Sequence, residues 1–361
     1  MALCYDRAVA TDYHNGIRAL LCTEDGRERS DLGPDEIDRF IAVEGNLLWL
    51  DIDSSVTTDL SLLKQEFGFH DLALEDALRP HQRPKIESFE GYFFLVFYAI
   101  GTRQWRTQPG GQGRDGDSAD PAQGELDFGR EVLQPHQIAM FIGTNFLVTV
   151  HHGAPAAVTE IAERWHGNIQ RIDRSISTLV YSLLDAIVDG YFPVIDQVAD
   201  VVEDIEEQIF EKFDQKALES IFALKKSLLA MRRVVAPERD VLNVLIRRDV
   251  PLLGASSVIY FQDVYDHVVR VTDSIDTYRD LLSSALDAYL SIASNRLNEV
   301  MRTLASWSIP LMAGALLAGI WGMNFRYMPE LEYRSGYLFA LGTIALTIGG
   351  TVVLFRTKRW L

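Results

Sequence analysis

The sequence predicts a membrane protein in which an α/β N-terminal domain and a bundle of long helices precede two transmembrane helices. Two uncharged stretches near the C-terminus predict the spans, because residues 303–325 and 335–355 hold 23 and 21 residues without a charge. About 20 apolar residues cross a bilayer core of about 30 Å. Strand-like apolar runs occupy the N-terminal part, and a helical pattern replaces them from about residue 169.

Residues 1–168 are predicted to form a cytoplasmic α/β domain. It has three strand-like segments, of which the last is a hairpin, and two helical segments between the first two strands. The strand-like segments are residues 46–53, 93–100 and 136–152, with the hairpin turn at 143–145, and the helical segments are residues 56–68 and 70–79. Residues 106–127 are rich in Gly, Pro, Asp and Gln, so we expect a disordered insertion there.

Residues 169–250 are predicted to form a cytoplasmic helical hairpin. Apolar residues recur at helical spacing over Ile169–Phe213 and again over Gln215–Arg248. Because proline breaks the hydrogen-bond ladder of a helix, we expect the first helix to bend at Pro193.

Residues 255–325 are predicted to form one long helix that includes the first span, 303–325. Between Gly254 and Gly314 no other glycine occurs, and the first proline after Gly254 is Pro310. At 1.5 Å per residue, a helix of some 65 residues is about 100 Å long. A helix of this length without internal caps indicates a coiled coil, a membrane span or an oligomer.

The charges that flank the spans predict that both termini are cytoplasmic. Arg296 and Arg302 precede the first span, and the tail 356–361 after the second span is basic. The connecting loop 326–334 carries both signs of charge, so the positive-inside rule puts it outside. The first residues have no apolar core of a signal peptide, which favours a multi-pass protein of the plasma (inner) membrane with its bulk in the cytoplasm.

Composition excludes several classes of function. The net charge of −17 speaks against nucleic acid and suits a protein that handles cations, although acids also simply keep a domain soluble. Cys4 and Cys22 have no CxxC partner, so neither a disulfide nor a thiolate zinc site is expected. No HExxH or GxxxxGK[ST] motif occurs, so we expect neither a metalloenzyme nor an ATP-driven pump.

One face of the long helix carries a stripe of small and flexible residues. At 100° per residue, the stripe is about 120° wide. Its members are Asn298, Met301, Leu304, Ser308, Met312, Ala315, Gly319 and Gly322. Two interpretations remain open, because a pore lining and a helix–helix packing face both use small residues, and Ala315-xxx-Gly319 fits the packing pattern.

The end of the first span resembles the CorA family of magnesium transporters. The resemblance rests on GMNF at 322–325 and MPEL at 328–331, with support from YFQDVYDH at 260–267 and LEDALRPHQRPKIESFE at 74–90. It implies a funnel-shaped homopentamer in a lipid bilayer, in which the long helix lines a central pore. It also implies channel-like uptake of divalent cations, chiefly Mg²⁺, driven by the membrane potential and closed by cytoplasmic Mg²⁺.

Two rival functions stay open beside this one. The first is a transporter of the same fold that carries Co²⁺, Ni²⁺ or Zn²⁺. The second is a membrane-anchored scaffold whose long helix is only a stalk. The stripe that ends at Asn324 speaks against the scaffold, because a stalk needs no such stripe.

The resemblance also assigns roles to single residues. It implies a selectivity filter at Gly322, Met323 and Asn324, where neutral amide and carbonyl oxygens would hold a hydrated ion that gives up its water reluctantly. It implies a hydrophobic gate at Met301 and Leu304 and a polar ring at Asn298. Ala315 departs from the threonine that many relatives carry in mid-pore, which puts an ion site there in doubt. The alternative role for Asn324 is a helix C-cap.

The remaining implied sites are carboxylates. Asp76, Asp263 and Glu75 match the positions at which the family shares regulatory Mg²⁺ between subunits, and Glu330 and Glu332 would attract cations to the outer mouth. For each of these groups, a solvated surface charge is the alternative. The acidic stretch 185–214 we interpret as a solvated helix face.

Overall fold

The computed structural model describes most of the chain and separates it into two units, Met1–Ala285 and Leu286–Leu361. Each unit is described by itself. The described residues are 16–24, 28–29, 37–43, 45–58, 60–101, 134–153, 155–168, 175–212, 215–247, 257–323, 334–358 and 360. The expected insertion 106–127 and the loop 326–333 lie outside them.

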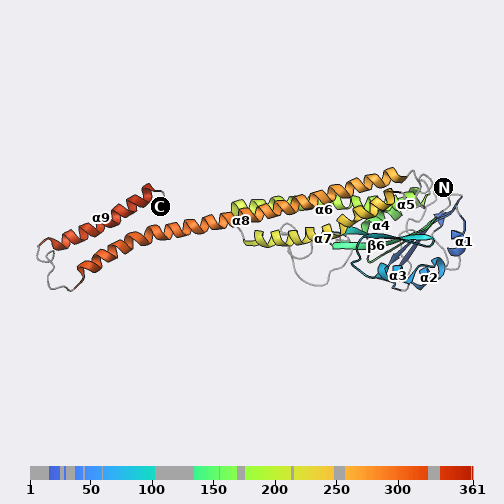
Figure 1. Cartoon of the computed structure of the whole chain (residues 1–361), viewed down its shortest axis with the longest axis horizontal. Coiled ribbons are helices and arrows are strands. Elements are labelled where there is room, and N and C mark those ends of the chain that lie inside the picture. The colour runs from blue at the N-terminus through green and yellow to red at the C-terminus, as the bar shows by residue number, and fades with distance from the viewer. Residues whose placement is uncertain are drawn as a thin grey trace, which may run out of the picture. The chain divides into compact units, whose positions relative to one another are not determined.

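The first unit is built on a mixed sheet of seven described strands (Figure 1). Its order is β2-β1-β3-β7-β6-β5-β4, and β3 and β7 run parallel while the other neighbours are antiparallel. The strands are β1 (Ile17–Cys22), β2 (Glu28–Arg29), β3 (Leu47–Asp53), β4 (Lys85–Phe89), β5 (Tyr92–Gly101), β6 (Gln134–Ile142) and β7 (Phe146–His151). All three predicted strand segments are present, and the hairpin turns at 143–145 as expected.

Alternate side chains of the central strands pack against two different layers of helices. On one face, apolar side chains such as Leu50, Phe94, Phe141 and Val148 form a single core with the short helices. These helices are α1 (Ile37–Ile41), α2 (Ser61–Phe67) and α3 (Asp71–Leu78). Because successive side chains in a strand point to opposite faces, the continuous apolar runs of the sequence correspond to strands that are covered on both sides.

Longer helices cover the other face of the sheet (Figure 1). They are α4 (Ala156–Asn168), α5 (Ile176–Asp189), α6 (Tyr191–Glu207), which continues as one π-helical turn to Lys212, and α7 (Gln215–Ile246). The expected bend near Pro193 is present as an interruption at Gly190, in the turn that precedes the proline. Pro193 has no N–H to bond the carbonyl of Asp189 four residues back, so the break lies where this proline weakens the helix.

A buried carboxyl group joins the sheet to this second helix layer. Glu238 of α7 is fully buried and accepts a hydrogen bond of 3.0 Å from the backbone N–H of Tyr98 in β5. The hydroxyl of Tyr191 bonds both Glu238 and the Tyr98 carbonyl. Burial raises the pKa of Glu238 well above its ordinary value, more than these hydrogen bonds lower it, which favours the neutral acid.

An ionic network lies between the sheet and the longer helices, on the face opposite the core with α1, α2 and α3. Asp51 accepts from Arg18 at 2.7 Å and from Thr149 at 2.5 Å, and it lies 2.9 Å from Nε2 of His151. All four side chains are buried. Burial alone would raise the pKa of Asp51, but the hydrogen bond and charge of His151, with Arg18 and Thr149, lower it overall. The imidazole's other nitrogen bonds the Gly153 carbonyl, so both ring nitrogens face acceptors, which favours the charged imidazolium.

The long helix α8 runs from Val258 to Trp321, close to the predicted length. Its first part belongs to the first unit, where it pairs with α7. Arg232 of α7 bonds Asp276 through two nitrogens, at 2.7 and 3.1 Å, and Lys225 donates to Ser283 at 2.7 Å. Its side chains Phe261, Val264, Val268, Val271 and Ile275 are buried.

The second unit holds the rest of α8 and the apolar helix α9 (Gly336–Thr357). The two helices touch at Gly314, where an added Cβ would lie 2.8 Å from Cδ1 of Ile348. Beyond α9, the Trp360 N–H donates to the Phe355 carbonyl at 2.9 Å, and the two rings stack in parallel with centroids 5.4 Å apart. Glycine at position 314 therefore sets how closely α8 and α9 approach.

Length and composition make three described helical segments apolar enough to cross a membrane: Ile176–Phe210, α8 and α9. The first of these was not among the two predicted spans. It packs against the sheet through α5, and its α6 part carries six carboxylates in seventeen residues. Because charged side chains at bilayer depth are costly, this segment fits a bundle outside the bilayer better than a span.

Candidate functional site

The predicted stripe lies on an uncovered face of α8 in the second unit. Met301, Leu304 and Met312 are 58 %, 60 % and 67 % exposed, although all three are apolar. Asn298, Ala315, Gly319 and Gly322 are also exposed, and Ser308 is half-buried. A water-soluble protein rarely exposes a contiguous row of this kind, so the stripe marks a surface with a further partner or function.

The face of α8 that packs against α9 is a different one. The buried residues in this part of the helix are Ser306, Pro310 and Gly314, which recur every four positions. At about 100° per residue, Met312 and Ser308 lie about 160° from Pro310, on the opposite side of the helix. A Cβ built at Gly319 would meet no described atom within 4 Å. Within the described residues, the small pair Ala315 and Gly319 is therefore not used for packing against α9.

The helix tightens as it ends at the predicted filter. The Gly322 N–H donates to the Ala318 carbonyl at 2.9 Å, while the Met323 N–H reaches back only three residues, to Ile320, at 3.3 Å. Met323 is half exposed. Asn324, Glu330 and Glu332 lie outside the described residues, so the roles expected for them stay predictions.

Three side chains of the first unit converge on one point of the helical layer. Asp185 of α5 and Asp263 and His267 of α8 each offer one ligand atom, and these atoms lie within 4.8 Å of one another. Asp263 is exposed, while the other two are half-buried. Two carboxylates and an imidazole are ligand types that divalent metals accept, and the open side leaves room for water or for further ligands.

The electrostatics of this group indicate a shortage of positive charge. Burial raises the pKa of Asp185, and the negative charges of Asp189 and Asp263 raise it further, although His267 lowers it. Nδ1 of His267 lies 3.6 Å from Oδ1 of Asp189, and the ring of Phe192 packs edge-on against the imidazole. A bound cation would relieve the repulsion among these carboxylates.

The other predicted regulatory residues do not join this group within the chain. Asp76 bonds Lys85 at 2.8 Å, and Glu75 bonds Arg79 at 2.5 Å. Both acids thus have a basic partner on or next to their own helix α3. Shared binding of an ion by Asp76 and Asp263, which the resemblance places between subunits, stays a prediction.

Sequence reasoning named Asp263 but missed Asp185 and His267. A signal for His267 was present, because positions 263 and 267 are four apart and share one face of a helix. No signal marked Asp185, which reaches the group only because α5 and α8 lie side by side in the bundle. Its sequence context, an acidic stretch, is typical of a solvated face.

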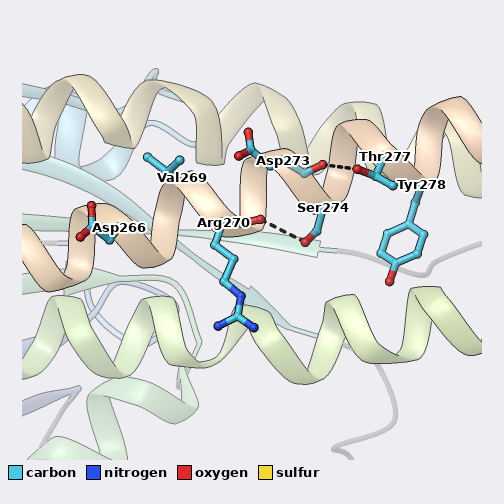
Figure 2. Close-up of a pocket in the computed structure, with 7 residues that line it drawn as sticks. All are labelled: Asp266, Val269, Arg270, Asp273, Ser274, Thr277 and Tyr278. Carbon is cyan, nitrogen blue, oxygen red and sulfur yellow. Dashed lines mark hydrogen bonds between the residues drawn. The ribbon is translucent and has the colours of Figure 1, made fainter.

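A second feature of α8 is an open hollow of about 480 Å³ just beyond the metal-ligand group. Figure 2 shows the residues that line it. Two of its hydroxyls bond their own helix, Ser274 to the Arg270 carbonyl at 3.0 Å and Thr277 to the Asp273 carbonyl at 2.8 Å. The Arg270 guanidinium lies over the Phe192 ring, 5.7 Å from its centroid. These polar groups are already engaged and do not converge, so we do not assign a ligand to the hollow.

Comparison with known sequences relates nearly the whole chain to one family. The model of the CorA-like Mg²⁺ transporter protein family matches residues 44–107 and 125–359. The chain is 33 % identical over 316 residues to the cobalt/magnesium transport protein CorA of Thermotoga maritima, covering 87 % of this chain and 83 % of that protein. It is 30 % identical to the metal ion transporter YfjQ of Bacillus subtilis, named as putative, over 86 % of this chain and 89 % of the relative.

Solved structures share the fold. The CorA magnesium transporter of Methanocaldococcus jannaschii aligns with a TM-score of 0.78 over 96 % of this chain and 98 % of its own, at 22 % sequence identity. Its soluble domain aligns with a TM-score of 0.58 over 77 % of this chain. At this level of identity the likeness establishes the arrangement of sheet, long helices and C-terminal apolar helices, as the sequence predicted.

Proposed function

Because the chain belongs to the CorA-like Mg²⁺ transporter family, we propose that it is a channel-like pore for Mg²⁺ uptake that cytoplasmic Mg²⁺ closes. Members of this family are ion transporters and not enzymes, as the sequence predicted. Uptake needs no chemical energy, because a divalent ion that moves inward gains about 4.6 kcal/mol per 100 mV of membrane potential. We place the protein in the plasma membrane with both termini in the cytoplasm.

The observation that carries the proposal is the separation of two faces on α8. Ser306, Pro310 and Gly314 pack toward α9, which leaves the stripe from Asn298 to Gly322 on the opposite side. In a homopentamer, five such faces would surround one axis, so that each stripe lines the pore while α9 lies outside it. Exposed apolar side chains at Met301 and Leu304 then form a ring that resists wetting when it is narrow.

The filter follows from the chemistry of the ion. Mg²⁺ holds its water tightly, and strong anionic ligands would trap the ion. We infer that Asn324 amides and carbonyls near Gly322 and Met323 bond the waters of a hydrated ion instead. Glu330 and Glu332 would raise the local cation concentration at the outer mouth.

The flux experiment uses the purified full-length protein in liposomes, with Mg²⁺ uptake driven by an inside-negative potential. Asn324→Ala is expected to lower uptake at least a hundredfold with the oligomer intact. Asn295→Ala, an exposed amide on α8 off the stripe, is the matched control and should transport like the parent. Normal uptake through Asn324→Ala protein of the parent's size would overturn the filter.

We propose that Asp185, Asp263 and His267 form the core of the regulatory metal site, to which Glu75 and Asp76 of a neighbouring subunit add ligands. At an effective dielectric of 20, two carboxylates 4 Å apart repel by about 4 kcal/mol, so an ion that bridges them favours the closed arrangement. Asp263→Ala should raise the cytoplasmic Mg²⁺ needed for half-closure and weaken the protection from protease that Mg²⁺ gives. Asp266→Ala, one turn along on the same helix, is the control. Equal midpoints in parent and Asp263→Ala protein would make Asp263 a surface acid.

One observation favours the second candidate, a transporter that also carries Co²⁺, Ni²⁺ or Zn²⁺. Imidazole nitrogen suits these transition metals, whereas Mg²⁺ prefers oxygen, and His267 belongs to the metal-ligand group. The relative from Thermotoga maritima is named for both cobalt and magnesium. Competition of Co²⁺, Ni²⁺ and Zn²⁺ with Mg²⁺ uptake separates the candidates. Loss of Co²⁺ closure but not Mg²⁺ closure in His267→Gln protein would assign the imidazole to the transition metals.

A further inference from the structure

A buried serine joins the pore helix to the end of the chain. Ser306 of α8 is fully buried, in a stretch where its neighbours Arg302, Thr303 and Leu304 are exposed. Its hydroxyl lies 2.8 Å from the carbonyl oxygen of Arg302 and 3.2 Å from that of Trp360. The hydroxyl has one proton, so the two carbonyls share it, and the bond to Trp360 is a tertiary contact between α8 and the C-terminal tail.

The tail is held in the position that this contact requires. The backbone N–H of Trp360 bonds the Phe355 carbonyl, and the two aromatic rings stack in parallel. The Trp360 carbonyl is thereby turned toward α8. Only the last turn of α9 and two further residues separate this point from the membrane-spanning part of α9.

The same turn of α8 is a weak point of the helix. Pro310 has no N–H, so the carbonyl of Ser306 lacks its helical partner four residues on. A serine whose hydroxyl bonds the carbonyl four residues back also loosens and bends a helix. Both effects act between the gate residues Met301 and Leu304 and the membrane part of the stripe. Bending of α8 at this turn would move the gate relative to the filter.

We propose that Ser306 and the Trp360 carbonyl form a latch that holds α8 across this weak turn and stabilises the closed gate. Ser306 and Trp360 are positioning residues, because neither lies on the stripe. The proposal rests on the proposed function, and it adds a control point at the C-terminus that is separate from the cytoplasmic metal-ligand group. Loss of the latch leaves ion selection unchanged and makes the closed state easier to leave.

The first test reads the contact without any transport. Ser306→Cys protein in lipid nanodiscs, with Cys4 replaced by serine and the buried Cys22 retained, is treated with a maleimide. We expect slow labelling in the full chain and at least tenfold faster labelling when residues 360–361 are deleted. Thr303→Cys protein, with an exposed thiol one turn away, should label quickly and equally in both lengths. Fast labelling of the thiol at position 306 in the full chain would overturn the latch.

The second test is a mutant cycle on closure. Ser306→Ala and the deletion of residues 360–361 should each raise the cytoplasmic Mg²⁺ for half-closure two- to tenfold, the change that loss of one neutral hydrogen bond produces in an equilibrium. The double variant should show no further rise, because both changes remove one contact. Unchanged closure in Ser306→Ala protein, or additive shifts, would overturn the proposal. A parent that carries no Mg²⁺ would instead overturn the proposed function, while the labelling result would still judge the contact.

Discussion

The two units of the chain differ in what covers their apolar residues. In the first unit, strands such as β6 and β7 are covered on both faces, and their side chains Phe141 and Leu147 have no exposed surface. In the second unit, the most apolar stretch of α9 has no buried residue, and only 17 % of the corresponding stretch of α8 is buried. Met301, Leu316 and Leu346 are each more than half exposed in the single chain.

The difference shows which part of the sequence specifies a structure by itself. The first unit buries the apolar core of its sheet and the polar networks around Asp51 and Glu238 within one chain. The second unit supplies one packed pair of helices and leaves the rest of its surface for other partners. Lipid on one side and further copies of the chain on the other would cover what the chain leaves bare.

The largest expected effect comes from replacing one phenylalanine by alanine in each unit and comparing the two variants. Phe141→Ala should destabilise the first unit by about 3–5 kcal/mol, because it leaves a cavity in a closely packed core. Phe339→Ala changes a side chain of the second unit that is 64 % exposed on α9, and it should leave the thermal unfolding of the first unit unchanged. Thermal melts of the full chain in detergent, followed through the sheet signal, make the comparison. Equal shifts would mean that the two units do not unfold separately.

A methionine pair sharpens the comparison from stability toward function. Met301→Ser should leave folding unchanged but raise Mg²⁺ leak about tenfold at high cytoplasmic Mg²⁺, because a hydroxyl lets water into the apolar ring. Met140→Ser, at a buried position of β6, should instead lower the melting temperature without a specific leak. Flux and melting are measured on both proteins. A tight Met301→Ser channel would remove this residue from the gate.

The smallest effect is a pH dependence confined to the first unit. Burial lowers the pKa of His151, but the hydrogen bond and charge of Asp51 raise it overall. The stabilisation from charged His151 is therefore complete below its unfolded pKa of about 6.5 and is lost as pH rises through the folded pKa. The stability difference between parent and His151→Gln protein should therefore shrink as the pH rises from 6 to 9. Denaturant midpoints at both pH values measure it, and a constant difference would contradict the charged form.

Sequence reasoning succeeded where one local pattern decided the structure. Continuous apolar runs predicted β3, β5 and the β6–β7 hairpin, and the uninterrupted helical pattern predicted α8. Strand β4 was missed because Lys85–Phe89 alternates charged and apolar residues too briefly to stand out. The bend expected near Pro193 lies three residues earlier, at Gly190, because a proline disturbs the helical turn that precedes it.

The site was harder to predict, because its parts meet only in three dimensions. The stripe on α8 could be found from spacing alone, but its separation from the packing face depends on where α9 lies. Asp185 and His267 join Asp263 through the packing of two helices that are distant in sequence. Ser306 and Trp360 are 54 positions apart, and no pattern in either segment indicates their contact.

The Glu238–Tyr98 hydrogen bond has a consequence for how the protein is made. Strand β4 pairs with β5 only as far as Val96. Beyond that point, the backbone N–H of Tyr98 donates its hydrogen bond to the carboxyl group of Glu238, which lies 140 positions later in the chain. At 5–20 residues per second, the ribosome needs roughly 7–28 s to reach Glu238 after Tyr98. During that interval, the nascent sheet has an unpaired edge on β5 beyond Val96. Strands of other chains can pair with such an edge, which leads to aggregation. Synthesis of the first unit therefore includes a vulnerable period that ends only when α7 leaves the ribosome and docks.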